Sequence, residues 1–209
     1  MGNLSTFVII IIVFIILLDK VRLIKYNYHN NKKRSIKNKK PRGCNNDLDK
    51  NKFNWSDYSN IETNNCYSYA LNFLDTKKKK LQPGHLSDNP DDFKLNCKTI
   101  KELVKSDNTA YDLDCHKDCK CDYHKIYLVL DDQDNLNDYH FYKQNNNGEW
   151  SHKPGLNRVT TRDSENNVIH NPRYANRNYK NLKNVLMFDE DILNYNKDCG
   201  CMCVKSKDK

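Results

Sequence analysis

The chain has 209 residues and a net charge of +8, a length that allows one domain of ordinary size with appendages. Residues 19–52 carry twelve Lys or Arg residues against three Asp residues, so the rest of the chain is close to neutral. Because the positive charge is concentrated in this one stretch, the net charge of the chain does not indicate nucleic-acid binding, and no nucleic-acid partner is expected. The nine cysteines are clustered, which favours local clips or a metal site over bridges across the whole scaffold.

The first segment is a run without charge at residues 4–18, and apolar residues continue to Ile24. A helix of about 20 residues spans the roughly 30 Å hydrocarbon core of a bilayer, so the run predicts a transmembrane helix over residues 4–24. Positive residues follow directly, which predicts that the C-terminal bulk faces the cytosol. We therefore expect a single-pass protein of a host or virion membrane, with the lipid bilayer as its partner. If the domain instead faces a lumen, Asn54-Trp55-Ser56 is a glycosylation acceptor.

Composition divides the chain into four parts. The stretch after the apolar run is rich in Asn and Lys and has almost no aliphatic residues, so it cannot bury a core and is expected to be a flexible linker. The predicted parts are a transmembrane anchor at residues 1–25, a basic disordered linker at 26–52, an α+β domain at 53–190 and a Cys-rich C-terminal tail at 191–209.

Helix signals come before strand signals in the predicted domain. Asn64 or Asn65 is suited to cap a helix that begins at Cys66, and Asn89 to cap a second helix that continues to Val104. Strands are expected at residues 124–131, 138–144, 150–154, 158–162, 167–170 and 185–188, with the Asn145–Glu149 connection forming a hairpin. This order predicts an α+β fold in which N-terminal helices pack on an antiparallel sheet, preceded by the transmembrane helix. Cys97 lies on the apolar stripe of the second helix and is expected in the core.

Cys66 is the candidate nucleophile. A thiol at a helix N-terminus meets unpaired N–H groups that stabilise its thiolate, although free Cys is also among the most buried residue types. A cysteine nucleophile needs a base and a group that orients the base. If Gln144 pairs with Trp150, then His152 is a diagonal neighbour of His140 on one face of the hairpin. A slip of one residue would put the two histidines on opposite faces.

These residues resemble the NlpC/P60 branch of the papain-like thiol hydrolases, in which a helix-starting Cys is followed by a His at the start of a strand and a second polar residue about a dozen positions on. The chain also resembles mostly uncharacterised phage and large-DNA-virus proteins, through the blocks Asn65–Leu71, Gln82–Gly84, His140–Gln144, Trp150–Gly155 and Ile169–Pro172. The resemblance implies a papain-like fold and hydrolysis of a peptide or amide. Cys66 would attack the carbonyl, His140 would act as base and acid, and His152 or Asn171 would orient His140.

A second group of residues has the chemistry of a metal site. Zinc is commonly held by four Cys or His ligands that come from two separate parts of the chain. Such ligands occur here in two clusters: Cys115, Cys119, Cys121 and His124 in the first, and Cys199, Cys201 and Cys203 in the second. Structural zinc is therefore one interpretation. Disulfides between the clusters are an equal alternative in an oxidising compartment. No cofactor is expected for catalysis.

Two functions follow from the sequence. The first is a membrane-anchored cysteine hydrolase with a Cys66, His140 and His152 or Asn171 site. The alternative is a catalytically inert interaction module, stapled by metal or disulfides and held at a membrane, in which the fold persists and the Cys66 thiol is unreactive. They differ in one property, because a nucleophilic Cys66 is alkylated well below pH 8 and an inert one is not.

Overall fold

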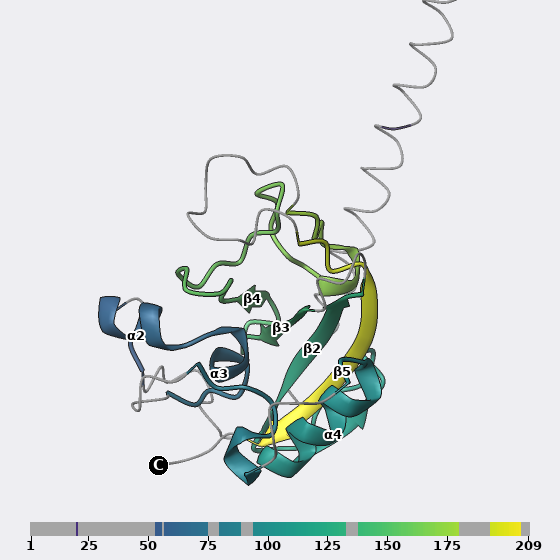
Figure 1. The fold of residues 1–209 in the computed structure, drawn as a ribbon. Coiled ribbons are helices and arrows are strands. Elements are labelled where there is room, and N and C mark those ends of the chain that lie inside the picture. Colours follow the sequence, from purple (N-terminus) through teal and green to yellow (C-terminus); the bar gives the residue numbers. More distant parts are fainter. Residues whose placement is uncertain are drawn as a thin grey trace, which may run out of the picture.

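A computed structural model describes Lys20 and residues 53–55, 57–74, 80–88, 94–132, 138–179 and 193–205. Its elements, in chain order, are α2 (Tyr58–Thr63), α3 (Cys66–Ala70), the 3-10 helix η1 (His85–Ser87), α4 (Cys97–Asp107), β1 (Ala110–Leu113), β2 (Tyr123–Asp131), β3 (Asp138–Gln144), β4 (Trp150–His152), the 3-10 helix η2 (Pro172–Tyr174) and β5 (Lys197–Lys205). The strands form one antiparallel sheet in the order β1-β5-β2-β3-β4. Figure 1 shows β5, in yellow, alongside β2.

The two helices predicted within the α+β domain are shorter than their sequence patterns predict. Asn65, one of the two predicted caps, is the N-cap of α3. The helix ends at Ala70 with Leu71 as its C-cap, because Asn72 adopts a left-handed conformation with φ of 53°. The second helix, α4, begins after Asn96, whose side chain accepts a hydrogen bond from the Thr99 backbone N–H at 2.9 Å. The cap predicted at Asn89 lies outside the described residues.

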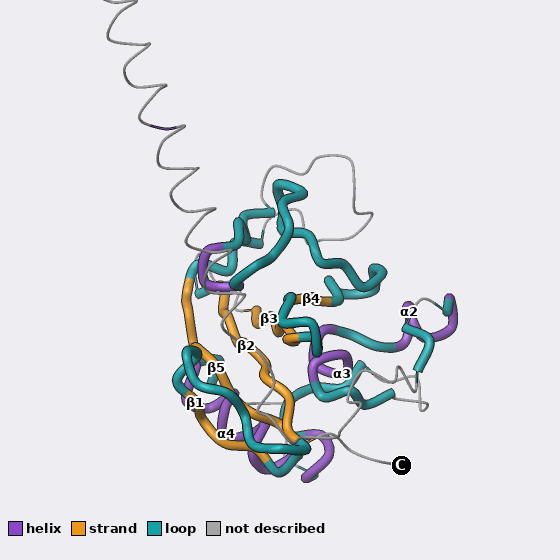
Figure 2. The backbone as a smooth tube through the Cα atoms, turned by 180° about the vertical axis from the view of Figure 1, so that it is seen from behind, coloured by secondary structure: helices purple, strands orange, loops and turns teal. Residues whose placement is uncertain are grey.

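The sheet has an apolar cluster on each face. On the first face, residues of α3 and α4 pack against alternate residues of β2 and β3: Tyr67, Leu71, Ile100, Val104, Ile126, Leu128 and Phe141. On the second face, loop segments between β4 and β5 bring Ile169, Tyr179, Leu193 and Tyr195 against Tyr127, Val129, Tyr142 and Trp150. Figure 2 shows these loops as teal tube on the side of the sheet away from α4. The sheet is therefore covered by helices on one face and by loops on the other.

Strand β5 contains a β-bulge that changes the direction of one cysteine. Leu128 pairs with Gly200 and Val129 pairs with Asp198, so Cys199 has no pairing partner on β2. Gly200 has φ of 87°, a conformation that glycine adopts without the strain of a Cβ atom. As a result Cys199 packs against the first face, whereas Cys201 packs against the second.

The predicted fold class is wrong. It combined papain-like helix packing with a transmembrane helix, whereas the described chain has three short α-helices and a five-stranded antiparallel sheet. Within the described ranges, no helix has the length and apolar character needed to cross a membrane. The residues on which the transmembrane prediction falls, 4–24, lie outside these ranges except for Lys20.

Other predicted elements also differ from those of the structure. Residues 197–205, assigned from sequence to a separate C-terminal tail, form β5, an interior strand of the sheet between β1 and β2. The strands predicted at 158–162 and 167–170 are represented by isolated bridges, Arg162 with Val168 and Thr160 with His152. The strand predicted at 185–188 and the linker at 26–52 lie outside the described residues.

Candidate functional site

Asn65 fixes the start of α3 from two directions. Its side-chain oxygen accepts a hydrogen bond from the Ser68 backbone N–H at 3.1 Å, and its Nδ2 donates to the Leu81 carbonyl at 2.7 Å. The first bond satisfies one of the unpaired N–H groups of the helix, and the second ties the helix to the turn at residues 81–84. Cys66 is consequently held in one position at the first residue of the helix.

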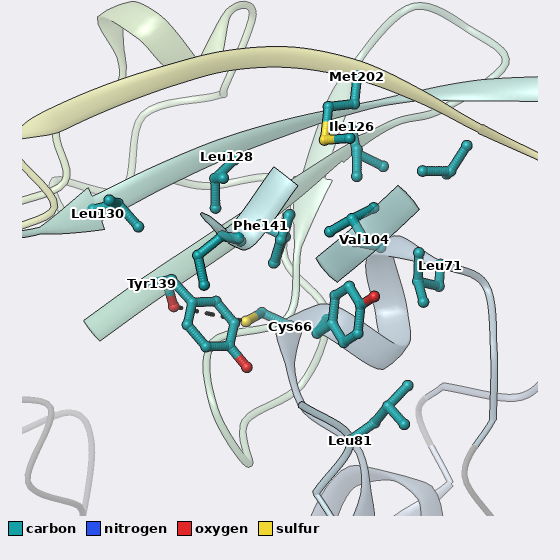
Figure 3. Close-up of a cluster of buried hydrophobic side chains, with 14 residues drawn as sticks. Cys66, Leu71, Leu81, Val104, Ile126, Leu128, Leu130, Tyr139, Phe141 and Met202 are labelled. Carbon is teal, nitrogen blue, oxygen red and sulfur yellow. Dashed lines mark hydrogen bonds between the residues drawn. The ribbon is translucent and has the colours of Figure 1, made fainter. Parts of the chain in front are cut away.

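Cys66 is buried and belongs to the cluster on the first face of the sheet. Its side chain is 6% exposed and is not part of a disulfide. Its Sγ lies 4.0 Å from the backbone carbonyl of Tyr139 and is surrounded by apolar side chains that include Leu81 and Phe141 (Figure 3). Apolar surroundings favour the neutral thiol, in opposition to the N–H groups of the helix, and they restrict the access of reagents.

The two candidate histidines are in contact. Gln144 pairs with Trp150 and Tyr142 pairs with His152, which is the register that places both histidines on one face. His140 Nε2 lies 2.8 Å from His152 Nδ1, and His152 Nε2 lies 2.9 Å from the Arg162 carbonyl. A carbonyl only accepts, so neutral His152 donates through Nε2 and accepts from His140 through Nδ1. This order leaves the lone pair of His140 on Nδ1, in the form of a base.

Burial keeps this histidine pair neutral. His140 is 3% exposed and His152 is 1% exposed. Desolvation lowers the pKa of His140 well below its usual range, and its electrostatic interactions with His152 and with the Arg177 guanidinium act in the same direction. Desolvation also lowers the pKa of His152 to about 4, against the opposing effect of the hydrogen bond to the Arg162 carbonyl. Both imidazoles are therefore uncharged at neutral pH.

The thiol and the histidine pair belong to different faces of β3. Side chains alternate along a strand, and Tyr139 and Phe141 pack in the cluster that contains Cys66. His140 therefore projects to the opposite face, where its ring lies 5.1 Å from that of Tyr142. The structure brings the two histidines together and places Cys66 against the backbone of the residue that precedes His140.

Asn171, the alternative orienting residue, lies at the start of η2. Its side chain caps η2 by accepting a hydrogen bond from the Arg173 backbone N–H at 3.0 Å. The group that orients His152 is the backbone carbonyl of Arg162. A backbone acceptor has no residue type of its own, so no sequence signal could have identified it.

The predicted metal ligands form disulfides. The bridges are Cys97–Cys199, Cys115–Cys201 and Cys119–Cys203, and Cys121 is also disulfide-bonded. Cys97, expected as a plain core residue, is therefore part of a bridge. A disulfide sulfur is not a thiolate, so in this state these residues offer zinc no ligand. In the part of the chain that the structure describes, no group of three or more His, Cys, Asp or Glu side chains is placed to hold a metal ion.

His124 is separated from the cysteine clusters. Its Nε2 lies 2.6 Å from the Ala70 carbonyl at the end of α3, and its side chain is buried. Desolvation lowers the pKa of His124 to about 4, with a further lowering from the charge of Lys143. Its role in the structure is to join β2 to the C-terminal end of α3.

Sequence patterns missed a buried carboxylate beside this site. Asp107 accepts hydrogen bonds from Tyr67 Oη at 2.8 Å, from the Gly84 backbone N–H at 2.6 Å and from Ser87 Oγ at 2.9 Å. It thereby joins the end of α4 to α3 and to the turn at residues 82–87. Asp is common at exposed positions near helix ends, so only the packing distinguishes this one.

Replacement of Asp107 with alanine is expected to lower the free energy of unfolding by about 3 kcal/mol, because it leaves a buried phenol and a buried backbone N–H without their acceptor. Urea unfolding of the full chain measures the change. Asp112 is the matched control, since its side chain is 49% exposed and pairs with Lys101 and Lys105 on the surface. Its replacement with alanine should cost less than about 1 kcal/mol. Equal losses in the two variants would contradict this role of Asp107.

Comparison with known proteins gives one informative match. The chain is 30% identical over 125 residues to insoluble matrix shell protein 1 from Ruditapes philippinarum, a match that covers 59% of this chain and 78% of that protein. No protein-family model matches the chain, and no solved structure matches it. The resemblance to the NlpC/P60 branch is thus neither supported nor opposed and stays a prediction.

The predicted classification and localisation need correction. The matched protein is named as a shell matrix protein, which is neither a viral protein nor a hydrolase by name. Disulfides persist in oxidising compartments and are rare in a reducing cytosol, so the bridges on β5 are at odds with a cytosol-facing domain. The expectation of a single-pass membrane protein with a cytosolic domain is therefore wrong.

Proposed function

This chain belongs to the family of insoluble matrix shell protein 1, and from that premise we propose that it is a disulfide-stapled structural module of a protein matrix, without catalytic activity. The observation that carries the proposal is the distribution of bridges on β5. Cys199 is bound to α4 on the first face of the sheet, and Cys201 and Cys203 are bound to the loop between β1 and β2. One strand is thereby fixed on both faces.

This arrangement suits a component that must keep its shape. Cross-links between residues that are 84 to 102 positions apart restrict the unfolded chain strongly, because they close long loops. All three bridges converge on β5, which lies between β1 and β2, so that strand cannot leave while the bridges are intact. A matrix protein of this kind acts through persistence of its fold, and its buried thiol needs no reactivity.

Alkylation of Cys66 in the native full chain tests the proposal. We expect iodoacetamide to label Cys66 only when the chain unfolds, at a rate that His140→Ala changes no more than it changes global unfolding. Peptide mass spectrometry across pH 6 to about 9 measures the rate, and the chain in denaturant supplies the fully accessible reference. Tyr142→Leu is the matched control for loss of a buried ring contact on the same face as His140. Rapid labelling below pH 8 that disappears in His140→Ala would contradict a structural role.

The predicted thiol chemistry is the second candidate function, favoured by the hydrogen-bond order at the histidine pair. The chain from His140 to His152 to the Arg162 carbonyl leaves His140 Nδ1 as a base, and Asn65 holds Cys66 at a helix N-terminus. That function requires Cys66 to leave the first-face cluster and reach His140 on the other face of β3, after which the base takes the thiol proton and the thiolate attacks the carbonyl of a peptide or amide. The alkylation experiment separates the two candidates, because only this one requires a thiolate in the folded state.

A further inference from the structure

The loop after β4 lies on the sheet without a covalent link. Its residues 158–176 are called the cover below. Residues 122–198 contain no cysteine, so no disulfide can hold the cover in place. Within the cover only Ile169 and Pro172 are buried. Segments with few buried apolar side chains open more readily than a core does.

His152 joins the cover to β4 with three hydrogen bonds. Its backbone N–H and carbonyl each make a hydrogen bond of 2.9 Å with the backbone of Thr160, and its Nε2 donates to the Arg162 carbonyl at 2.9 Å. A further hydrogen bond of 3.3 Å runs from the Trp150 N–H to the Ile169 carbonyl. The docking of the cover on β4 therefore depends on the position of one imidazole ring.

Described residues bound the cover at both ends. Before it, the chain turns at Gly155, which has φ of 40°. After it, Arg177 is held to Asp198 at 2.6 Å. Inside the cover, the Ser164 N–H donates to the Asn176 carbonyl at 3.1 Å, which keeps its two ends together. The cover can thus move as one unit between Gly155 and Arg177, while Arg177 stays on β5.

The histidine pair accommodates one additional proton but not two. In the neutral pair, His140 Nε2–H donates to His152 Nδ1 over 2.8 Å. A first proton on His140 Nδ1 leaves this hydrogen bond in place. A second proton on His152 Nδ1 directs two N–H groups at each other, because both ring nitrogens of an imidazolium are donors. The doubly protonated rings must therefore separate.

His152 is the ring that is free to move once the pair separates. His140 belongs to β3, an interior strand, and packs against the rings of Tyr195 at 5.2 Å and Tyr142 at 5.1 Å. His152 belongs to β4 at the edge of the sheet, with the cover on its other side. Movement of its ring breaks the hydrogen bond to the Arg162 carbonyl, so separation of the pair undocks the cover.

The charges around the pair do not hold a doubly protonated form together. Besides desolvation, the Arg177 guanidinium opposes a proton on His140. Asp163 attracts a proton on His152, but Asp163 belongs to the cover and its Oδ2 already accepts from the Asn176 backbone N–H at 3.0 Å. The other titratable groups that face the pair are the phenols of Tyr142 and Tyr195 and the carboxyl of Asp138, which accepts from Tyr195 Oη at 2.8 Å.

We propose that acid opens this protein at the cover. Binding of two protons to His140 and His152 releases residues 158–176 from β4, while the part of the sheet that is bridged on β5 stays folded. The open form exposes Trp150 and the outer edge of β4, which Thr160 and Ile169 occupy in the closed form. This switch gives a stapled module one movable part, and it does not depend on whether Cys66 reacts.

Hydrogen exchange of the native full chain tests the opening. Mass spectrometry at pH 7.0 and pH 4.5 gives the protection of each peptide relative to the unfolded chain at the same pH. We expect peptides with Thr160 and Ile169 to lose at least about 100-fold of their protection, because each histidine that titrates normally in the open form contributes about tenfold for each pH unit below 6.5. Peptides of β2 and β5 should remain the better protected at pH 4.5.

Three variants identify the group that responds to acid. His152→Gln should reduce the change in the protection of the cover to less than about tenfold, since the second proton has no acceptor. His124→Gln is the matched control, because His124 is a buried histidine with a pKa of about 4 that contacts the end of α3 instead of the cover, and it should leave the change intact. Asp138→Asn should also leave it intact.

Three outcomes would overturn the proposal. They are equal protection of the cover and of β5 in the wild-type chain at pH 4.5, an undiminished pH dependence in His152→Gln, and loss of this dependence in Asp138→Asn. The wild-type comparison requires no variant, so it decides the question even where His152→Gln does not fold. None of these outcomes bears on the bridges of β5, so the stapled module would stand without the switch.

Discussion

Full reduction of the three described disulfides is expected to lower the free energy of unfolding by about 10 kcal/mol and to unfold the domain at 25 °C. Closure of a loop of 102 residues is worth about 5 kcal/mol in the chain-entropy account, and each further bridge adds about 2 to 3 kcal/mol because it closes a shorter additional loop. Small domains are stable by only about 5 to 15 kcal/mol in total. Near-ultraviolet circular dichroism with and without dithiothreitol measures the loss.

Individual pairs provide the graded control for this prediction. With the other bridges intact, Cys97→Ala with Cys199→Ala releases a loop of about 20 residues and should cost about 3 kcal/mol, whereas Cys119→Ala with Cys203→Ala releases a shorter loop and should cost about 2 kcal/mol. Urea unfolding gives both values. Retention of the native spectrum by the fully reduced chain would show that the hydrophobic clusters suffice without the bridges.

Acidification is expected to destabilise the protein between about pH 6.5 and about pH 4. His124 and His152 have a pKa of about 4 in the folded chain, and the pKa of His140 is held well below its usual range, whereas histidine in an unfolded chain has a pKa near 6.5. Within this window the unfolded chain binds protons that the folded chain does not, so stability falls as pH falls. His124 and His152 each contribute about 3 kcal/mol of stability that is fully present above pH 6.5 and lost towards pH 4, and His140 acts in the same direction.

Urea unfolding at pH 7.0 and at pH 4.5 measures this dependence. In His152→Gln the difference in unfolding free energy between the two pH values should shrink by about 2 kcal/mol, because one buried proton acceptor is gone. His116 is the matched control, since it is exposed and its replacement with glutamine should leave the difference unchanged. A wild-type protein equally stable at both pH values would contradict the assignment of these histidines as buried and neutral.

Local sequence patterns were sufficient to predict strand β2 and the hairpin of β3 and β4. The continuous apolar run at Ile126–Leu130 lies in β2, and the connection at residues 145–149 contains a glycine at φ of 85° that suits the turn. The resulting register of Gln144 with Trp150 brought the two histidines together, as the diagonal relation requires. Here the sequence period and the turn residues act within about a dozen residues, so distant parts of the chain have little influence on them.

Strand β5 could not be identified from its own residues. Lys197, Asp198 and the three cysteines have no clear alternation of apolar and polar side chains, and the bulge at Gly200 shifts the alternation by one residue. Its burial depends on an acceptor formed by residues 97–131, and its position in the sheet is a long-range property. The position of Cys66 is also a long-range property. The packing of α3 against β3 decides on which face of the sheet its thiol lies, whereas the cap at Asn65 decides only where α3 begins.

Peptide mapping of the native full chain without reduction tests the central claim most directly, after alkylation has blocked every accessible thiol. The account predicts three linked peptide pairs, Cys97–Cys199, Cys115–Cys201 and Cys119–Cys203, and a Cys66 that is alkylated only in denaturant. Detection of Cys115, Cys119, Cys201 and Cys203 as thiols, with release of an equimolar amount of zinc on unfolding, would contradict it and restore the metal site as the element that fixes β5.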